Sequence, residues 1–500
     1  MSAAVVPAIE VIEHALPDQA RQKRPARLAE LWLLLLAIVA SAGAFALVGL
    51  GLDGYLPDGF WGDSALLAAV ALVAHLAVRF AAPFADQTIL PTVIFLNGIG
   101  IAMISRIERS GGLQATMSDA ARQMQWSLLG VVVACLVLWV IKDHRSLRRF
   151  TYTSMFIGLG LLMLPLAPGI GRTINGATRW IVIGGFSLQP AEFAKIFLAI
   201  FFAGYLVRAR DALAMAGPKI LGLQLPRMRD LGPILLVWGA AMAVMIFQTD
   251  LGVSLLFFGM FVAMLYIATD RISWMVIGAV LFAGGAFAIW QSFPHVGQRM
   301  DAWLNAMDPV IFNARGGSGQ LVRGMFSMAN GGMFGTGFGR GHPYLTPFAF
   351  SDFIYTSLGE ELGLTGLLAI LIAFLVLIER ALRTALTVRD GFGKLLAGGL
   401  AVTLALQVFV VVGGVTRLIP LTGLALPFLA QGGSAVLANW IVIALLLRIS
   451  DSARRPSAAP QAGHVAVLPV IPLSEAERPS TSALPVVDGD DAALTAGGVA

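Results

Sequence analysis

The sequence is poor in charge and almost free of cysteine. Charged residues make up 13% of its 500 residues, whereas a soluble globular domain has about 25%. This low share excludes an ordinary soluble protein, because long apolar runs recur along the whole chain. The single cysteine, Cys135, excludes an internal disulfide and a cysteine-ligated metal site. The six histidines are scattered, so a histidine-ligated metal is not expected either.

Long apolar runs dominate what is present. Hydrophobic residues make up 57% of the chain, and about 20 consecutive apolar residues cross a bilayer as a helix. We therefore predict an all-α fold, a polytopic membrane helix bundle of about 12 transmembrane helices with a large extracytoplasmic loop. The predicted spans are 29–50, 65–84, 88–105, 123–141, 150–168, 190–207, 231–248, 251–269, 272–291, 353–379, 396–415 and 434–449.

The basic residues carry a topology signal. The net charge of +5 comes from Lys and Arg clusters between the apolar runs, which is typical of a membrane protein and not of a nucleic-acid-binding surface. The predicted loop 52–63 has no Lys or Arg and three Asp. Because basic residues concentrate in cytoplasmic segments, we predict a multi-pass protein of the inner (plasma) membrane with both termini cytoplasmic. Ten arginines then fall outside and are candidates for binding an anionic ligand: Arg106, Arg109, Arg122, Arg172, Arg179, Arg299, Arg315, Arg323, Arg340 and Arg417.

Asp352 is the first candidate for chemistry. It ends the large outside loop and comes directly before a predicted span. One interpretation is structural: Ser351 would cap the helix, and an acid in the first turn would complement the helix dipole. The other is functional: a carboxylate at the outer membrane surface acts as a general base, kept ionised by the helix terminus and basic by a partly apolar setting.

Charges inside predicted spans form the second group of candidates. Glu192 and Lys195 follow Pro190 and lie on one helical face at spacing i,i+3. They are either an ion pair that holds the helix to its neighbours or contacts to a polar substrate headgroup, since charges in spans face a partner or a cavity. Glu360 is eight residues from Asp352, which predicts a shared helical face.

Three segments between spans are also informative. Asp250, in a tight turn, is either a helix cap or a functional residue. The Gly-rich run 335–341 lacks the Lys-Ser/Thr of a phosphate-binding loop, so we reject a nucleotide site. Its backbone, with Arg323 and Arg340, remains a candidate anion contact. The break at 426–434 is either a packing corner or the lining of a substrate groove.

Together these segments resemble the SEDS family (shape, elongation, division and sporulation), which includes the RodA and FtsW proteins. The resemblance covers roughly residues 125–450, and six motifs occur in the family's order and spacing. They are Asn175–Trp180, Gln189–Lys195, Gln248–Gly252, Asn330–Gly337, Ser351–Ile354 with Gly359–Gly363, and Pro427–Ser434.

The resemblance implies a peptidoglycan glycosyltransferase, an inverting enzyme that polymerises lipid II into glycan strands during cell-wall elongation or division. It implies a class B penicillin-binding protein as partner, undecaprenyl-pyrophosphate-linked glycan as substrate, and no nucleic acid. Asp352 matches the family's essential aspartate. No resident metal is predicted, although a divalent cation (Mg²⁺ or Mn²⁺) stays open. The predicted substrate-binding residues are Arg179, Glu192, Lys195, Arg323, Arg340, Glu360, Gly432, Gly433 and Ser434.

The chain also departs from the family pattern. Phe348 and Phe350 stand where many members have a Glu and a His before the aspartate. Added N-terminal spans and a long tail resemble actinobacterial members, closer to RodA than to FtsW. The predicted parts are a cytoplasmic leader (1–28), extra helices with a loop (29–122), the core (123–450, outside loop 292–351) and a disordered cytoplasmic tail (451–500). A lipid II flippase or another polytopic transporter is the alternative function, and a non-catalytic scaffold is a third.

Overall fold

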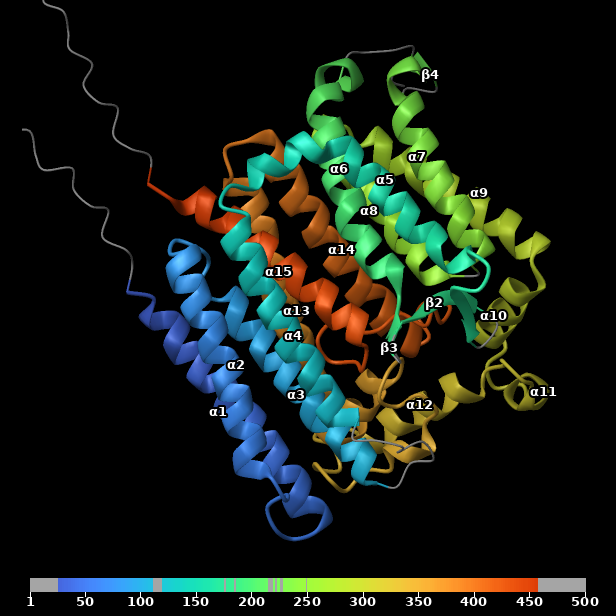
Figure 1. Cartoon of the computed structure of the whole chain (residues 1–500). Helices are drawn as coiled ribbons and strands as arrows, with labels where there is room; N and C mark the ends of the chain where they lie inside the picture. The colour runs from blue at the N-terminus through green and yellow to red at the C-terminus, as the bar shows by residue number, and fades with distance from the viewer. Residues whose placement is uncertain are drawn as a thin grey trace, which may run out of the picture. The chain divides into compact units, whose positions relative to one another are not determined.

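The computed structural model (Figure 1) describes residues 26–110, 119–174, 177–183, 186–214, 219–220, 223–224, 228–248 and 250–456. The predictions for most of the leader (1–25) and most of the tail (457–500) lie outside the described residues. The same holds for Asn175, Gly176 and Thr249 of the motifs.

Each of the twelve predicted spans forms a long helix in the described part of the chain. Eleven of these helices are long and apolar enough to cross a membrane, and the twelfth, α7, has a shorter described apolar stretch, Leu235–Val244. The predicted polytopic helix bundle is therefore confirmed. The helices are α1 (Leu28–Leu52), α2 (Phe60–Ala81), α3 (Ile89–Arg109), α4 (Asp119–Val140), α5 (Thr151–Met163), α6 (Pro190–Ala214), α7 (Met228–Phe247), α8 (Leu251–Thr269), α9 (Ser273–Ser292), α13 (Ile354–Thr387), α14 (Gly391–Val415) and α15 (Gly433–Arg454).

The start of α1 and the end of α15 meet at one face of the bundle. Arg27, before α1, donates hydrogen bonds to the carbonyl oxygens of Pro83 and Ala85 between α2 and α3, at 3.0 and 2.9 Å. In the same turn, the amide of Phe84 donates to Asp451 of α15 at 2.9 Å. These contacts place the two described ends of the bundle at one face. That this face is cytoplasmic stays a prediction from the basic clusters.

The first two helices pack on α3 and α4 and lie at one edge of the bundle (Figure 1). Small residues allow the close approach: a Cβ on Gly98 of α3 would lie 2.1 Å from the Ser41 hydroxyl of α1. Helices in membranes associate through such small residues, because lipid provides no hydrophobic drive.

A small sheet at the opposite face departs from the predicted all-α fold. Strands β1 (Gly171–Ile174), β2 (Ala177–Ile183) and β3 (Phe186–Leu188) form an antiparallel sheet in that order, within the predicted outside loop 169–189. The β-branched and aromatic residues of β2 favour this conformation. A second pair, β4 (Lys219–Ile220) and β5 (Leu223–Gln224), is also antiparallel.

The large loop before α13 is itself helical. It contains α10 (Pro294–Leu304), α11 (Pro309–Asn313), α12 (Gly319–Gly331) and a 3₁₀ turn at Pro343–Leu345. Helix α12 packs on α13. A Cβ on Gly324 would lie 2.7 Å from the Phe353 ring, so this contact fixes the end of the loop where Asp352 lies.

Candidate active site

Asp352 lies in a turn, not in a helix. Helix α13 begins at Ile354, and its N-cap, Phe353, makes no side-chain cap. The amides of Ser351 and Phe353 both donate to the Phe348 carbonyl, at 3.0 and 3.1 Å. The prediction that Ser351 caps a helix with Asp352 in its first turn is therefore wrong, because this tight turn ends before the helix starts. Helical spacing to Glu360 consequently does not set the direction of the Asp352 side chain.

Four charged side chains from separate elements gather at this turn. Arg179 of β2 places its Nη1 3.7 Å from Oδ2 of Asp250. Arg299 of α10 interacts electrostatically with Asp250, Asp352 and Arg179. A Cβ on Gly423, whose φ is +72°, would lie 3.5 Å from Oδ2 of Asp352 and 3.8 Å from Nη2 of Arg179. Glycine suits this position because it adopts a positive φ without strain and leaves room for both groups.

Asp250 caps a helix, which was one of the two interpretations, and it also lies in the charged cluster; a functional role stays a prediction. Its Oδ1 accepts a hydrogen bond from the amide of Val253 at 3.3 Å and so caps α8. Its Oδ2 accepts from Nε2 of Gln189 at 3.2 Å and faces Arg179. One carboxylate therefore starts a helix and also belongs to the charged cluster.

The setting makes Asp352 a stronger base than an ordinary aspartate. Burial raises the pKa of its carboxyl, the two arginines Arg179 and Arg299 oppose this rise, and Asp250 adds to it. Burial also raises the pKa of Asp250, against the effect of Arg179. A raised pKa makes a carboxylate a better proton acceptor, which suits general-base work.

A cavity of about 960 Å³ opens beside this cluster. Among its described lining residues, Asp352 is the only acid, and four arginines share the lining: Arg179, Arg299, Arg315 and Arg323. Nε of Arg179 and Nη1 of Arg299 are buried without a hydrogen-bond partner in the described part of the chain. Buried donors normally have partners, so these two indicate an anionic ligand. Phe348, with a strained φ of 56°, Trp303, Phe312 and Leu421 add apolar surface.

Arg299 was not chosen as a site residue from the sequence. It appeared only among the ten outside arginines, in a loop without a recognisable motif. Its link to Asp352 depends on how α10 folds over the end of the bundle, and no residue spacing reveals that placement. The excess of arginine in an outside loop was the one available signal.

The two other predicted arginine contacts differ in position. Arg323 of α12 lines the cavity, with its guanidinium 5.9 Å from the centre of the Phe312 ring. Arg340 is exposed and is not part of the lining. The structure thus brings Arg179 and Arg323 together with Asp352, and leaves Arg340 apart from them.

Glu360 and its neighbour Glu361 hold the loop before the active-site turn. Glu360 accepts hydrogen bonds from the Ser327 hydroxyl at 2.8 Å and the His342 amide at 2.9 Å. Glu361 accepts from Nε of Arg106 at 2.7 Å. Both acids face protein, as acids in a span were expected to do, and neither lines the cavity.

Glu192 and Lys195 form the ion pair that was one of the two interpretations. Nζ of Lys195 is 2.6 Å from Oε2 of Glu192, and it also donates to Gln407 of α14 and Asn439 of α15, at 3.2 and 3.1 Å. Both charged side chains are buried and lie outside the cavity lining. This contact joins α6 to two neighbours.

The break before α15 forms a packed corner. The Ser434 hydroxyl accepts a hydrogen bond from the Gln189 amide at 3.2 Å. A Cβ on Gly433 would lie 2.2 Å from the Trp126 ring, and the amide of Gly432 donates to Gln123 at 3.3 Å. These three residues do not line the cavity; they join α15 to α4 and to the segment before α6.

The comparisons agree with the motif resemblance. Residues 87–455 match the family model of cell cycle proteins that covers FtsW, RodA and SpoVE. The chain is 47% identical over 434 residues to the peptidoglycan glycosyltransferase RodA of Mycobacterium tuberculosis, covering 86% of this chain and 92% of that relative. It is 32% identical over 375 residues to the stage V sporulation protein E of Bacillus subtilis, covering 74% and 98%.

A solved structure shares the fold. It belongs to work described as "Structural coordination of polymerization and crosslinking by a peptidoglycan synthase complex", with a TM-score of 0.53 and 23% identity over 79% of this chain and 98% of that one. The family match covers more than half of the residues, and the mycobacterial relatives are of the RodA type. The chain therefore belongs to the FtsW, RodA and SpoVE family.

Proposed function

We propose that this protein is a peptidoglycan glycosyltransferase that polymerises lipid II. The observation that carries the proposal is a cavity of about 960 Å³ whose described lining holds one carboxylate, Asp352, and four arginines, two of which interact with it. Its relatives named as peptidoglycan glycosyltransferases support the same reaction.

The reaction is a single displacement. Asp352 takes the proton from the 4-hydroxyl of the acceptor GlcNAc as that oxygen attacks the anomeric carbon of the donor MurNAc. The bond to the lipid pyrophosphate breaks, and the anomeric configuration inverts, because one base and no covalent intermediate are involved. Negative charge grows on the leaving pyrophosphate, and guanidinium groups placed there stabilise the transition state. We assign this role to Arg179, Arg299 and Arg323, which share the cavity lining with Asp352.

The lining does not fit a resident divalent cation. It offers one carboxylate against four guanidinium groups, and Mg²⁺ and Mn²⁺ prefer several oxygen ligands. In the described residues, no three His, Cys, Asp or Glu side chains lie close enough to hold a metal. No step of the proposed reaction therefore passes through a metal.

We place the cavity on the extracytoplasmic side of the plasma membrane, with both termini in the cytoplasm, because the basic clusters predict this orientation. We also propose a class B penicillin-binding protein as partner, since new glycan strands have to be crosslinked. Co-purification of such a protein with the full-length chain tests the partnership, and failure to recover one in detergent and in nanodiscs would contradict it.

The decisive experiment is polymerisation of purified lipid II by wild type and by Asp352→Asn. Losing a general base lowers the rate about 10²–10⁴-fold, so the variant should make almost no glycan. Asp301→Asn, at an exposed acid of α10 in the same loop, is the matched control and should polymerise normally. Glycan synthesis by Asp352→Asn at the wild-type rate would exclude this role.

The flippase alternative predicts a different result in the same preparation. Reconstituted wild type would move lipid II across the vesicle membrane and make no glycan. The sheet and the loop helices cover the charged cluster on one side of the bundle only. This arrangement favours a reaction at the membrane surface over transport through the bundle. Transport without polymerisation would overturn the enzyme proposal.

A further inference from the structure

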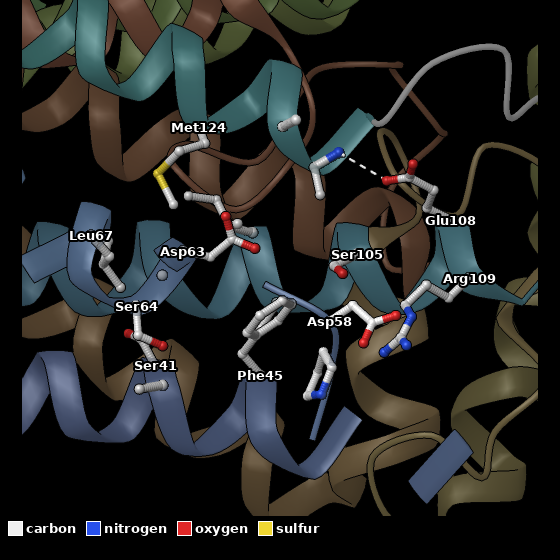
Figure 2. Close-up of a pocket in the computed structure, with 17 residues that line it drawn as sticks. Ser41, Phe45, Asp58, Asp63, Ser64, Leu67, Ser105, Glu108, Arg109 and Met124 are labelled. Atoms are coloured by element: carbon white, nitrogen blue, oxygen red, sulfur yellow. Dashed lines mark hydrogen bonds between the residues drawn. The ribbon is translucent and has the colours of Figure 1, made fainter. Parts of the chain in front are cut away.

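A second cavity lies among the four N-terminal helices, apart from the residues around Asp352. Its volume is about 330 Å³, and residues of α1, α2, α3 and α4 line it (Figure 2). Helices α1 and α2 precede residue 87, where the family match begins. Half of the helices around the cavity therefore lie outside that match, and the proposed glycosyl transfer gives the cavity no role.

One part of the cavity wall is apolar, and another part is formed by acidic residues. Phe45, Leu67, Ile101 and Met124 contribute the apolar surface. The acids among the lining residues are Asp58, Asp63 and Glu108. The only base among the described lining residues is Arg109, whose Nη2 is 2.7 Å from the carboxylate of Asp53. The charged part of the cavity is therefore negative, and it attracts a cationic group.

Two hydroxyl groups in the lining have no hydrogen-bond partner among the described residues. Ser105 of α3 is only 8% exposed and makes no side-chain hydrogen bond within the described part of the chain. The hydroxyl oxygen of Ser64 of α2 is buried and also lacks a partner there. Since buried hydroxyls normally pair with protein or a bound molecule, these two indicate a ligand with a polar end.

A metal ion does not suit this site. Among the described residues, no three carboxylates, imidazoles or thiols lie close enough to share one, and hard cations such as Ca²⁺ need six or more oxygen ligands. An organic cation needs only dispersed carboxylates and hydroxyls, and it can carry the apolar body that the remaining walls match. The volume lies at the small end of known ligand pockets.

We propose that this cavity binds a small amphiphile with an ammonium group. The ammonium donates to the carboxylate of Asp63 and to the Ser64 and Ser105 hydroxyl oxygens, while Asp58 and Glu108, which also accepts from the Ala120 amide at 3.2 Å, add negative charge. The hydrocarbon part packs against Phe45, Leu67, Ile101 and Met124. Such a group could come from the headgroup of a membrane lipid or from a free amine.

The test uses the full-length protein in nanodiscs of phosphatidylglycerol and a hexylammonium probe that carries a diazirine. Photolabelling should mark peptides within 41–67 and 98–124, the ranges that contain most of the lining. A hydrogen bond to a charged group is worth about 1.5–3 kcal/mol, so hexylammonium should compete at least about tenfold better than hexanol or hexanoate. Equal competition by hexanol, or labelling only elsewhere, would overturn the proposal.

Variants show whether the probe labels the protein from this cavity or from the membrane in general. Asp63→Asn removes one charge and Ala42→Phe fills the space, and both should weaken labelling about tenfold. The controls are Asp301→Asn and Val39→Phe, which change exposed positions outside the lining. If Ala42→Phe does not fold, Asp63→Asn decides the question, because its side chain is exposed. Unchanged labelling of Asp63→Asn would contradict an ammonium site.

Two further experiments identify the source of the ammonium group and distinguish this proposal from the glycosyltransferase proposal. Phosphatidylethanolamine in the nanodisc competes with the probe if a lipid headgroup is the ligand, and does not compete if a free amine is. Both results support an ammonium site. Asp352→Asn should label like wild type, so failure of the glycosyltransferase proposal would leave this result unaffected.

Discussion

Two clusters of buried charge lie in the same helix bundle, and they are built differently. In the first, Lys195 has three donors and three acceptors, on Glu192, Gln407 and Asn439. In the second, Arg179 and Arg299 each keep a buried nitrogen without a partner in the described residues, beside a large cavity. Lys195 itself uses all of its donors, although Nδ2 of Asn439 is buried without a partner in the described residues. What separates the two clusters is the cavity: the Lys195 cluster ties helices together, whereas the spare arginine donors lie where a ligand can bind.

The largest expected effect tests the cluster around Lys195. Lys195→Met leaves the Glu192 carboxylate buried without its cation, which should cost about 3–5 kcal/mol of unfolding free energy. The double variant Glu192→Gln/Lys195→Met removes both charges and should recover much of that loss. Denaturant unfolding of the purified protein measures both values.

The exposed Lys142 provides the control for this comparison. Lys142→Met should unfold like wild type, because an exposed charge contributes little to stability. If Lys195→Met were also as stable as wild type, the cluster would not hold the helices together. If Lys195→Met lost lipid II turnover without losing stability, the other interpretation, that Lys195 contacts the substrate headgroup, would be supported.

A smaller effect should distinguish two arginines that look alike in the sequence. Arg323 lines the cavity and Arg340 does not. Losing a hydrogen bond to a charged group costs about 1.5–3 kcal/mol, so Arg323→Ala should lower kcat/KM about 10–100-fold, while Arg340→Ala should leave it unchanged. Steady-state polymerisation of lipid II measures both. Equal losses in the two variants would mean that the cavity does not define the substrate site.

The sequence predicted the helices well because membrane spans follow from length and hydropathy alone. It also selected Asp352 and Arg179 through their motifs, and both line the same cavity. It failed where folding of the loops decides the geometry. Arg299 reaches the cluster only through the position of α10. Asp352 lies outside α13 because it belongs to a turn, closed by hydrogen bonds to the Phe348 carbonyl, that ends before the helix begins.

Paired charges within a span were ambiguous for a different reason. The spacing of Glu192 and Lys195 places them on one helical face, but it does not say what that face meets. Gln407 and Asn439 come from helices far along the chain, and no local pattern links them to Lys195. Whether a buried charge meets a partner or a cavity is therefore a property of packing.

The smallest expected effect is a shift in the pH dependence of kcat/KM, and its direction tests the cluster around Asp352. Arg299 opposes the raised pKa of Asp352, so Arg299→Gln should raise that pKa further and move the acid limb of kcat/KM to higher pH. Asp250 adds to the raised pKa, so Asp250→Asn should lower it and move the acid limb to lower pH. Asparagine still caps a helix, so α8 should remain intact. Profiles of lipid II polymerisation against pH measure both shifts. Two shifts in the same direction would mean that the base reporting on this limb is not the carboxylate between these charges.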